Sequence, residues 1–235
     1  MNLDSLFSSL KQKALNFLFP PRCVSCGKGG VFLCRKCHNK LIYLQTPLCV
    51  RCSKPIRAGT ICSKCQSQTW NIDGICSVFK YGGAIRQAII QFKYKNIKAL
   101  DDPLSHFMMG YLRKHSLSFD IIIPVPIHER RLRERGYNQS LLLAKKLSHM
   151  TRLPVVEASL IRTKNTPHQA SSDSVKQRRE NIRNAFKCVN HDISGKRILL
   201  IDDVCTSGAT LNSCATSLKS ASAALVWGLT LAKEI

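Results

Sequence analysis

Eight of the twelve cysteines form four Cys-x-x-Cys pairs, a pattern whose chemistry is metal binding. The pairs are Cys23/Cys26, Cys34/Cys37, Cys49/Cys52 and Cys62/Cys65. A two-residue spacer lets both thiolates of a pair reach one ion, and two pairs complete a tetrahedral four-cysteine site. The sequence therefore predicts two structural Zn2+ ions, and a redox role for one pair is the weaker alternative.

The gaps between the pairs indicate how they group into sites. The seven residues between Cys26 and Cys34 are enough for a short hairpin and include glycines suited to a tight turn. Nine residues separate Cys52 from Cys62. We favour two sequential ribbons, 23–37 and 49–65, and the cross-braced pairing stays open as the alternative.

A second chemical motif follows the apolar run at 198–201. It consists of an acid pair, Asp202 and Asp203, followed by a loop made of Thr206, Ser207, Gly208, Ala209 and Thr210. The loop at 206–210, called the phosphate loop below, leads into an expected helix, whose free backbone amides and dipole can hold a phosphate. Two acids beside a phosphate suit sugar hydroxyls, or a developing positive charge, better than the phosphate itself.

Strands and helices alternate after residue 75 and must position these groups. Strands are expected at 75–81, 119–125, 155–161, 196–201 and 224–231, and helices at 83–92, 101–115, 138–150 and 209–220. This alternation predicts an α/β fold with a parallel sheet and right-handed crossovers. Ligands of such sheets bind beyond the carboxyl ends of the strands. Two basic stretches, 128–136 and 162–187, are expected near that cleft, the second as a mobile loop or hood.

Apolar residues at helical spacing over 3–19 predict an amphipathic N-terminal helix that ends at Pro20 and Pro21. We expect this helix to dock against the body of the protein, with membrane-surface contact as the alternative. The expected division is a helix at 1–21, a double zinc ribbon at 22–72 and an α/β domain at 73–235. The absence of a long apolar run and of a secretory signal favours a cytoplasmic protein, the inner face of the cytoplasmic membrane being the alternative location.

The chain is strongly basic. It has 36 Lys plus Arg against 14 Asp plus Glu, a formal net charge of +22 at pH 7. Eight thiolates and two Zn2+ ions together contribute about −4, which would leave about +18. Such a charge favours polyanionic partners, nucleic acid or anionic lipid, and general solubility is the alternative explanation. Phe32, Tyr43 and Trp70 are either base-stacking or packing residues.

The strand, acid pair and TSGAT loop resemble the phosphoribosyl-pyrophosphate motif of type I phosphoribosyltransferases. Together with the cysteine-rich head, the segment PVPIHERRLRERGYNQ at 124–139 and the segment RRENIRNAF at 178–186, nearly the whole chain resembles the competence protein F family. The resemblance implies a type I phosphoribosyltransferase fold with a hood, behind a double zinc ribbon. It also implies a DNA-uptake protein that handles incoming single-stranded DNA on the cytoplasmic side during natural transformation.

The resemblance further implies residue roles. Asp202 and Asp203 would be catalytic and hold the ribose hydroxyls, and the phosphate loop would hold the 5-phosphate. The loop that would lie near the diphosphate, with Mg2+, consists of PVP and the following residues: Pro124, Val125, Pro126, His128, Arg130 and Arg131. The residues that match recurrent hood positions are Arg162, Thr166, Gln169, Arg179 and Asn181.

Partners and activity remain alternatives at this point. Single-stranded DNA and phosphoribosyl pyrophosphate are the expected ligands, and a competence helicase, recombination proteins and a peripheral membrane contact are implied by the resemblance alone. The alternative function is an active phosphoribosyltransferase that displaces pyrophosphate with an unidentified nucleophile. No glutaminase cysteine follows the initiator Met, so an amidotransferase that makes its own ammonia is not expected.

Overall fold

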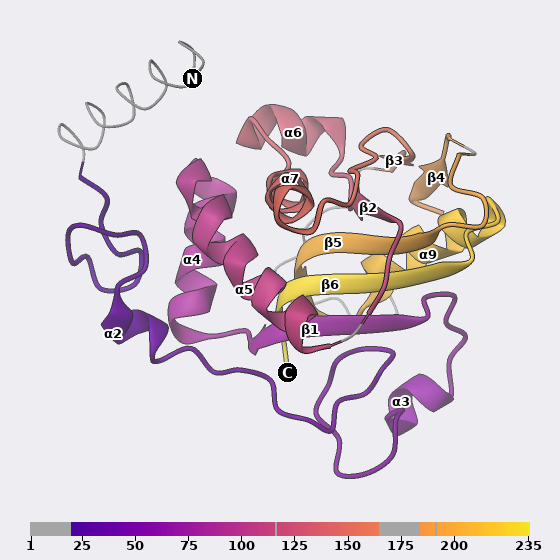
Figure 1. Cartoon of the computed structure of the whole chain (residues 1–235), viewed down its shortest axis with the longest axis horizontal. Coiled ribbons are helices and arrows are strands. Elements are labelled where there is room, and N and C mark those ends of the chain that lie inside the picture. Colours follow the sequence, from indigo (N-terminus) through magenta and orange to yellow (C-terminus); the bar gives the residue numbers. More distant parts are fainter. Residues whose placement is uncertain (1–19, 116, 165–183, 191) are drawn as a thin grey trace.

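The computed structural model describes residues 20–115, 117–164, 184–190 and 192–235 (Figure 1). The strands are β1 (Gly74–Lys80), β2 (Ile121–Pro124), β3 (Leu160–Arg162), β4 (Phe186–Cys188), β5 (Arg197–Cys205) and β6 (Leu225–Lys233). The helices are α2 (Arg35–His38), α3 (Ser63–Gln66), α4 (Gly83–Tyr94), the 3-10 helix η1 (Lys98–Leu100), α5 (Asp101–Lys114), α6 (Glu129–Arg135), α7 (Gln139–Thr151) and α9 (Ala209–Ser220). The short helices α2 and α3 belong to the cysteine-rich segment.

Four parallel strands form the main sheet in the order β1-β6-β5-β2. The central strands β5 and β6 are buried over most of their length, as their apolar sequences predict for strands covered on both faces. Helices connect these parallel strands, α9 between β5 and β6 among them. A separate antiparallel pair joins β3 to β4. The predicted α/β fold, a parallel sheet flanked by helices, is confirmed.

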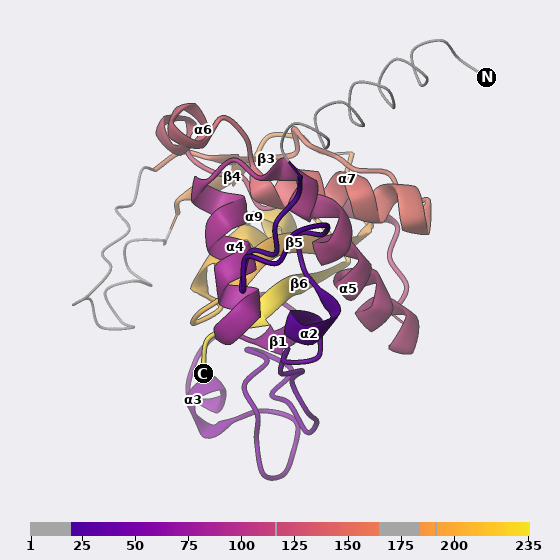
Figure 2. The same cartoon turned by 90° about the vertical axis from the view of Figure 1, so that its left-hand side faces the viewer.

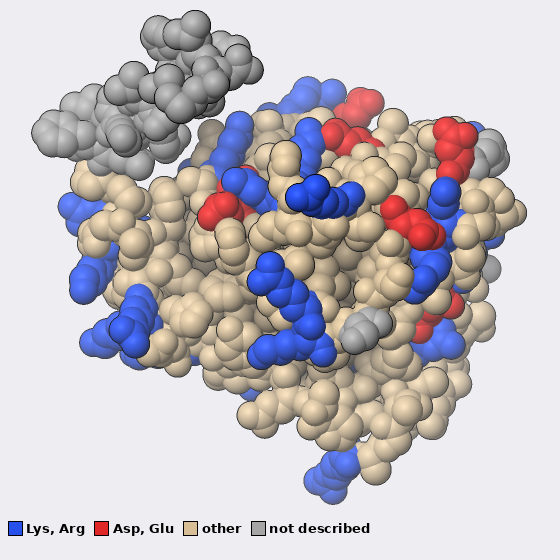
Figure 3. Space-filling model, in the orientation of Figure 1, with Lys and Arg blue, Asp and Glu red and all other residues tan. Residues whose placement is uncertain are grey.

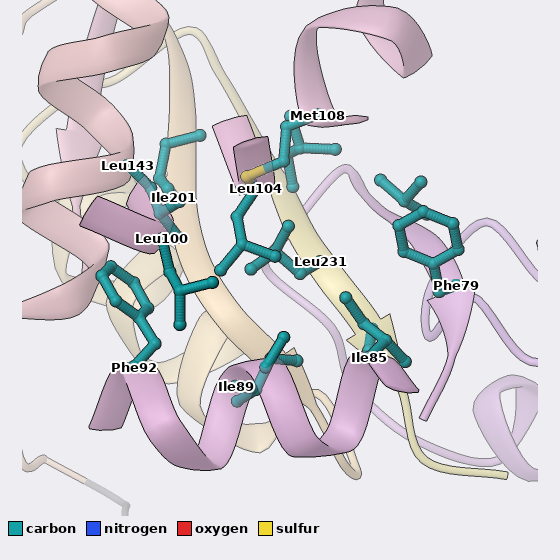
Figure 4. Close-up of a cluster of buried hydrophobic side chains, with 14 of the residues drawn as sticks. Phe79, Ile85, Ile89, Phe92, Leu100, Leu104, Met108, Leu143, Ile201 and Leu231 are labelled. Atoms are coloured by element: carbon teal, nitrogen blue, oxygen red, sulfur yellow. The ribbon is translucent and has the colours of Figure 1, made fainter. Parts of the chain in front are cut away.

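Alternate residues of β5 enter two separate cores, because successive side chains of a strand point to opposite faces. Leu199 and Ile201 belong to one core. Figure 4 shows Ile201 there among side chains from α4, α5 and α7. Ile198 and Leu200 belong to the other core, which contains residues of α9, β3 and β4. At the end of β5 the same alternation directs neighbouring side chains to different faces.

The cysteine-rich segment covers the outer edge of β1. The Lys80 N–H donates to the Ile42 carbonyl at 2.8 Å, and the Ile75 N–H donates to the Val50 carbonyl at 2.7 Å. Figures 1 and 2 agree that α2 and α3 lie on the β1 side of the sheet, whereas α6 and the β3–β4 pair lie on the opposite side. The ribbons therefore satisfy backbone groups that an edge strand would otherwise expose.

Eight expected elements are present with small shifts in their ends: α4, α5, α7 and α9, and β1, β2, β5 and β6. The strand expected at 155–161 is wrong in its extent. Val155 forms only an isolated parallel bridge with Ile122, the chain bends over 157–159, and β3 begins at Leu160.

The loop expected at PVP and the residues that follow is shorter than expected, because only residues 125–128 lie between β2 and helix α6. His128 caps this helix, its Nδ1 accepting from the Arg130 N–H at 3.2 Å. Gly136 ends it with a left-handed φ of 74°, and Arg130 pairs with Glu134 one turn later at 3.0 Å. Caps and ion pairs thus form a helix from a sequence with little apolar periodicity.

The expected N-terminal helix at 3–19 and most of the expected hood, 165–183, lie outside the described residues. The described ends of the hood segment are β3 and β4, which pair with each other. Among the helices that the structure describes, none combines the length and the apolarity needed to cross a membrane.

Candidate functional site

Each group of four cysteines brings its sulfur atoms within 4.8 Å of one another, in the sequential grouping that the spacing favours. Cys26 Sγ lies 3.6 Å from Cys34 Sγ, and Cys52 Sγ lies 3.9 Å from Cys62 Sγ. A tetrahedral zinc ion with Zn–S distances of about 2.3 Å separates its sulfurs by about 3.8 Å. The residues therefore fit two closed sites for structural zinc.

Backbone amides favour the thiolate form of these ligands. The Cys34 N–H points to Cys23 Sγ at 3.5 Å, and the Cys62 N–H points to Cys49 Sγ at 3.3 Å. Burial opposes ionisation of Cys23 and Cys49, but hydrogen bonds from backbone amides outweigh it. They lower the pKa of Cys23 to about 6 and that of Cys49 to about 7. Because thiolate is the metal-binding form, each ribbon holds one cysteine ready to ligate zinc at neutral pH.

The acid pair lies near the end of the central strand β5, and its first member, Asp202, is a half-buried carboxyl with a raised pKa. Asp202 Oδ1 accepts from Ser140 Oγ at 3.0 Å and from the Asp203 N–H at 2.9 Å. Burial, with the charge of Asp203, raises the pKa of Asp202 to about 6, although Lys93 and the two hydrogen bonds oppose the rise. The carboxyl therefore changes charge close to neutral pH.

The second acid, Asp203, is held by a lysine from α4. Lys93 Nζ lies 2.8 Å from Asp203 Oδ1, and the two side chains are only 16% and 8% exposed. Burial lowers the pKa of Lys93, but the charge and hydrogen bond of Asp203 outweigh it, so that the pKa is raised. The ammonium is therefore retained, and it fixes this carboxylate against α4.

The phosphate loop turns β5 into α9 through a glycine. Gly208 precedes the twelve-residue helix with a left-handed φ of 82°, a conformation that favours glycine. The Ser207 hydroxyl accepts from the Ala209 N–H at 3.3 Å. The ammonium of Lys233, which is buried at the end of β6, donates to the Thr206 carbonyl. Lys233 thus holds the start of the loop. The first turn of α9 has free amides at the carboxyl edge of the sheet.

Three arginines from two elements, α6 and β3, form a basic group: Arg131, Arg135 and Arg162. Burial lowers the pKa of both Arg131 and Arg162, and the charge of Arg135 lowers both further, whereas the charge of Asp202 raises that of Arg162. These mutual effects mean that the guanidinium groups are close enough to repel one another. Such a group is suited to a multiply charged anion.

Two other residues assigned to the diphosphate lie differently. Arg130 has a side chain 68% exposed and pairs with Glu134 on the outer side of α6. His128 serves as the cap of that helix. The structure therefore brings Arg131 to the basic group and leaves Arg130 on the solvent side. The hood positions Thr166, Gln169, Arg179 and Asn181 lie outside the described residues.

Four residues of the site were missed by reasoning from the sequence: Lys93, Arg135, Ser140 and Lys233. Arg135 lies four residues after Arg131, so recognition of α6 as a helix would have placed both on one face. Ser140 follows the α7 cap Asn138, a local signal for the helix start but not for its contact with Asp202. No spacing pattern connects Lys93 or Lys233 to the motif.

Amides that bind anions, two carboxylates and a cationic group therefore meet at one edge of the sheet. The amides suit a phosphate, the carboxylates suit hydroxyl groups, and the arginines suit a second anionic group. A ligand that combines all three features matches the arrangement.

Comparison with known proteins gives a family match for the cysteine-rich head and low-scoring likenesses to solved structures. A family model described as a double zinc ribbon domain matches residues 14–66. Among solved structures, the chain has a likeness to glutamine phosphoribosylpyrophosphate amidotransferase from B. subtilis, at 16% identity and a TM-score of 0.41 over 60% of this chain and 30% of that one. A purine phosphoribosyltransferase from Pyrococcus horikoshii gives 20% identity and a TM-score of 0.35 over 56% and 71% of the two chains. The chain spans less than a third of the amidotransferase.

Relatives of the whole chain are more similar. Competence protein F of Haemophilus influenzae is 31% identical over 84% of this chain and 96% of that protein. Competence protein ComFC of Bacillus subtilis is 30% identical over 79% and 77% of the two chains, and DNA utilization protein YhgH of Escherichia coli is 27% identical over 84% and 89%. With its double zinc ribbon and an acid pair at the end of a parallel strand, the chain belongs to the competence protein F family.

Proposed function

We propose that this chain binds phosphoribosyl pyrophosphate with Mg2+ at the carboxyl end of β5. One observation carries the proposal: the acid pair lies near the end of β5, and the strand leads into a loop whose glycine opens a long helix. A ligand that is both a sugar and a phosphate uses the two halves of this motif at once. The relatives' names support a place in competence, and the site chemistry supports the ligand.

Each half of the site would have a separate task. Amides and hydroxyls of the phosphate loop would hold the 5-phosphate, and Asp202 and Asp203 would accept hydrogen bonds from the ribose hydroxyls. Arg131, Arg135 and Arg162 would face the diphosphate. Mg2+ prefers carboxylate and phosphate oxygens, and it would offset the charge of the diphosphate when bound.

Titration calorimetry on the full-length, zinc-loaded protein tests this binding. We expect a single site for magnesium phosphoribosyl pyrophosphate and an affinity weakened about tenfold or more by Asp202→Asn, because hydrogen bonds to a charged group are lost. Asp192→Asn changes an exposed carboxyl elsewhere and should leave the affinity unchanged. Absence of binding, or equal affinity for both variants, would contradict the proposal.

We also infer that the chain handles incoming single-stranded DNA on the cytoplasmic side during natural transformation. Two of the relatives are named as competence proteins, and a third as a DNA utilization protein. The net charge of +22 supports contact with a sugar-phosphate backbone. Basic side chains also outnumber acidic ones over the face in Figure 3. Tyr43, 49% exposed, remains a candidate for base stacking, whereas Trp70 lies against Gly208.

Salt dependence of DNA binding tests this second part. Fluorescence anisotropy with a labelled single strand should show an affinity that falls about tenfold or more between about 50 and 200 mM salt. Binding that is absent, or independent of salt, would contradict it.

An active phosphoribosyltransferase is the second candidate function, favoured by the adjacent carboxyls of Asp202 and Asp203 near the phosphate loop. In that reaction a nucleophile would bond to C1 of the ribose while the C1–O bond breaks and pyrophosphate leaves with the bonding electrons. Negative charge on the acid pair would stabilise positive charge that develops on the sugar. Pyrophosphate release would be measured across bases and amines, with Asp202→Asn as control. Release no faster than in the variant, with ligand binding intact, would contradict this activity.

A further inference from the structure

The second ribbon, residues 49–65, lies directly against the phosphate loop. A Cβ built on Gly208 would come within 3.0 Å of the Trp70 ring, which therefore rests on the loop itself. Cys205 is the last residue of β5, just before the loop, and its Sγ lies 4.0 Å from the Cys52 carbonyl oxygen. Trp70 also contacts the cluster of buried cysteines of this ribbon. The ribbon and the loop thus share one packed region.

Residues 70–72 connect this ribbon to the helix that follows the loop. An Arg51 guanidinium nitrogen donates to the Ile72 carbonyl at 2.6 Å and to the Trp70 carbonyl at 3.3 Å. Asn212 Oδ1 of α9 accepts from the Asn71 N–H at 2.8 Å and from the Ile72 N–H at 3.2 Å. Because Arg51 lies between Cys49 and Cys52, a zinc-binding turn reaches α9 through a short run of hydrogen bonds.

The first ribbon is tethered to different elements and provides an internal comparison. Gln91 of α4 donates to the Val24 carbonyl at 3.4 Å, and His38 stacks on Phe107 of α5 with ring centres 5.4 Å apart. Three of its cysteines, Cys23, Cys34 and Cys37, join the core that contains residues of α4 and α5. The two ribbons are similar in their ligands and differ in what they touch.

We propose that the second ribbon is a positioning element of the phosphate site, through Trp70 and Arg51. On this proposal, zinc at Cys49, Cys52, Cys62 and Cys65 and a phosphorylated ligand at the loop stabilise each other's binding. The proposal rests on the proposed binding of phosphoribosyl pyrophosphate. Zinc at the first ribbon takes no part in this coupling.

The physical reason is the way that four thiolates hold the turn containing Arg51. Without a zinc ion no bond links Cys49, Cys52, Cys62 and Cys65 to one another, and the turn opens. Arg51 then loses its fixed position, and the carbonyls at 70 and 72 lose a charged donor. Trp70 no longer holds the left-handed turn at Gly208. Coupling between two binding equilibria is reciprocal, so the ligand must in turn retain the zinc.

Matched cysteine variants test the coupling in the full chain. Cys62→Ser removes the third ligand of the second ribbon, and Cys34→Ser removes the corresponding ligand of the first. Metal analysis should find one zinc per chain in each. Calorimetry with magnesium phosphoribosyl pyrophosphate should then give an affinity weakened about fivefold or more by Cys62→Ser and nearly unchanged by Cys34→Ser. Similar affinities, or similar losses, in the two variants would overturn the proposal.

Zinc release provides the reciprocal measurement and requires no catalytic activity. In Cys34→Ser the remaining zinc lies in the second ribbon, and saturating ligand should slow its transfer to a colorimetric chelator about fivefold or more. In Cys62→Ser the remaining zinc lies in the first ribbon, and the ligand should not change its release. Equal protection in both, or none, would overturn the proposal.

A variant that keeps all eight cysteines separates positioning from folding. Trp70→Ala should weaken ligand affinity while both zinc ions remain bound, and Trp70→Phe should recover most of it because an aromatic ring still rests on Gly208. Unchanged affinity in Trp70→Ala would overturn the positioning role. If the unmodified protein binds no phosphoribosyl pyrophosphate, the proposed function and this inference fail together. If the unmodified protein binds but the variants show no contrast, only the inference fails.

Discussion

Lys93 of α4 and Asp203 of β5 form an ion pair of 2.8 Å between two largely buried side chains. The pair connects a helix near the start of the sheet domain to the last residues of its central strand. The pKa of the neighbouring Asp202 is raised to about 6, mainly by burial and by the charge of Asp203. Asp203 pairs with Lys93 of α4, whereas Asp202 accepts a hydrogen bond from Ser140 of α7. The two adjacent acids therefore have different electrostatic surroundings.

Removal of Lys93 should destabilise the fold, because Asp203 would remain buried without its partner. For Lys93→Met we expect the free energy of unfolding to fall by about 3–5 kcal/mol in urea titration. Asp203→Asn added to that variant should restore much of the loss. Lys145→Met is the control: its pair with Glu157 is also 2.8 Å long, but the side chains are 51% and 46% exposed, so a change of about 0–1 kcal/mol is expected. Equal losses in the two single variants would refute the role of burial.

Ionisation of Asp202 should make stability depend on pH in a direction opposite to that of a salt-bridged acid. Its folded pKa of about 6 lies above the ordinary value of 3.8, so the folded state binds the proton more tightly. Stability is then lost as pH rises from about 4 to 6. Asp202→Asn stays neutral, and we expect it to gain roughly 3 kcal/mol relative to the unmodified protein over that interval. Unfolding measured at several pH values would contradict this if the difference were constant.

The two sides of α6 should differ in their effect on ligand binding. Arg131 belongs to the basic group with Arg135 and Arg162, whereas Arg130 pairs with Glu134 in solvent. Arg131→Gln should therefore weaken the binding of magnesium phosphoribosyl pyrophosphate about tenfold or more in calorimetry, and Arg130→Gln by about twofold or less. A larger effect from Arg130 would place the diphosphate elsewhere.

Zinc removal should open the outer edge of β1. Metal analysis is expected to find two zinc ions per chain, and chelation should unfold both ribbons. The amides of Ile75 and Lys80, which donate to carbonyls of the cysteine-rich segment, should then lose protection in hydrogen exchange. The amide of Leu199 in the central strand should stay protected. Unaltered protection at Ile75 and Lys80 after metal loss would show that the edge does not depend on zinc.

Features carried by contiguous residues could be predicted from the sequence. The cysteine pairs and the run from Asp202 to Thr210 each contain their own geometry, since a short spacer or a strand end fixes where the side chains lie. The alternation of apolar segments likewise predicts the parallel sheet. Helix α6 was missed because its sequence is almost entirely charged and its start depends on a single cap at His128. A helix stabilised by caps and ion pairs gives no hydrophobic signal.

Contacts between distant segments could not be predicted in the same way. Lys93 and Asp203 meet only because α4 packs beneath the end of β5, and nothing in either segment specifies the other. The same holds for Lys233 under Thr206 and for Trp70 on Gly208. These contacts depend on strand order and on where the ribbons cover the sheet, which local patterns do not encode.

A crystal structure of the protein grown with phosphoribosyl pyrophosphate and Mg2+ tests the account most directly. It should show the 5-phosphate on the backbone amides of residues 207–210, the ribose hydroxyls on Asp202 and Asp203, and the diphosphate toward Arg131. Electron density for the sugar at a different place, or an unoccupied loop at saturating ligand, would contradict it.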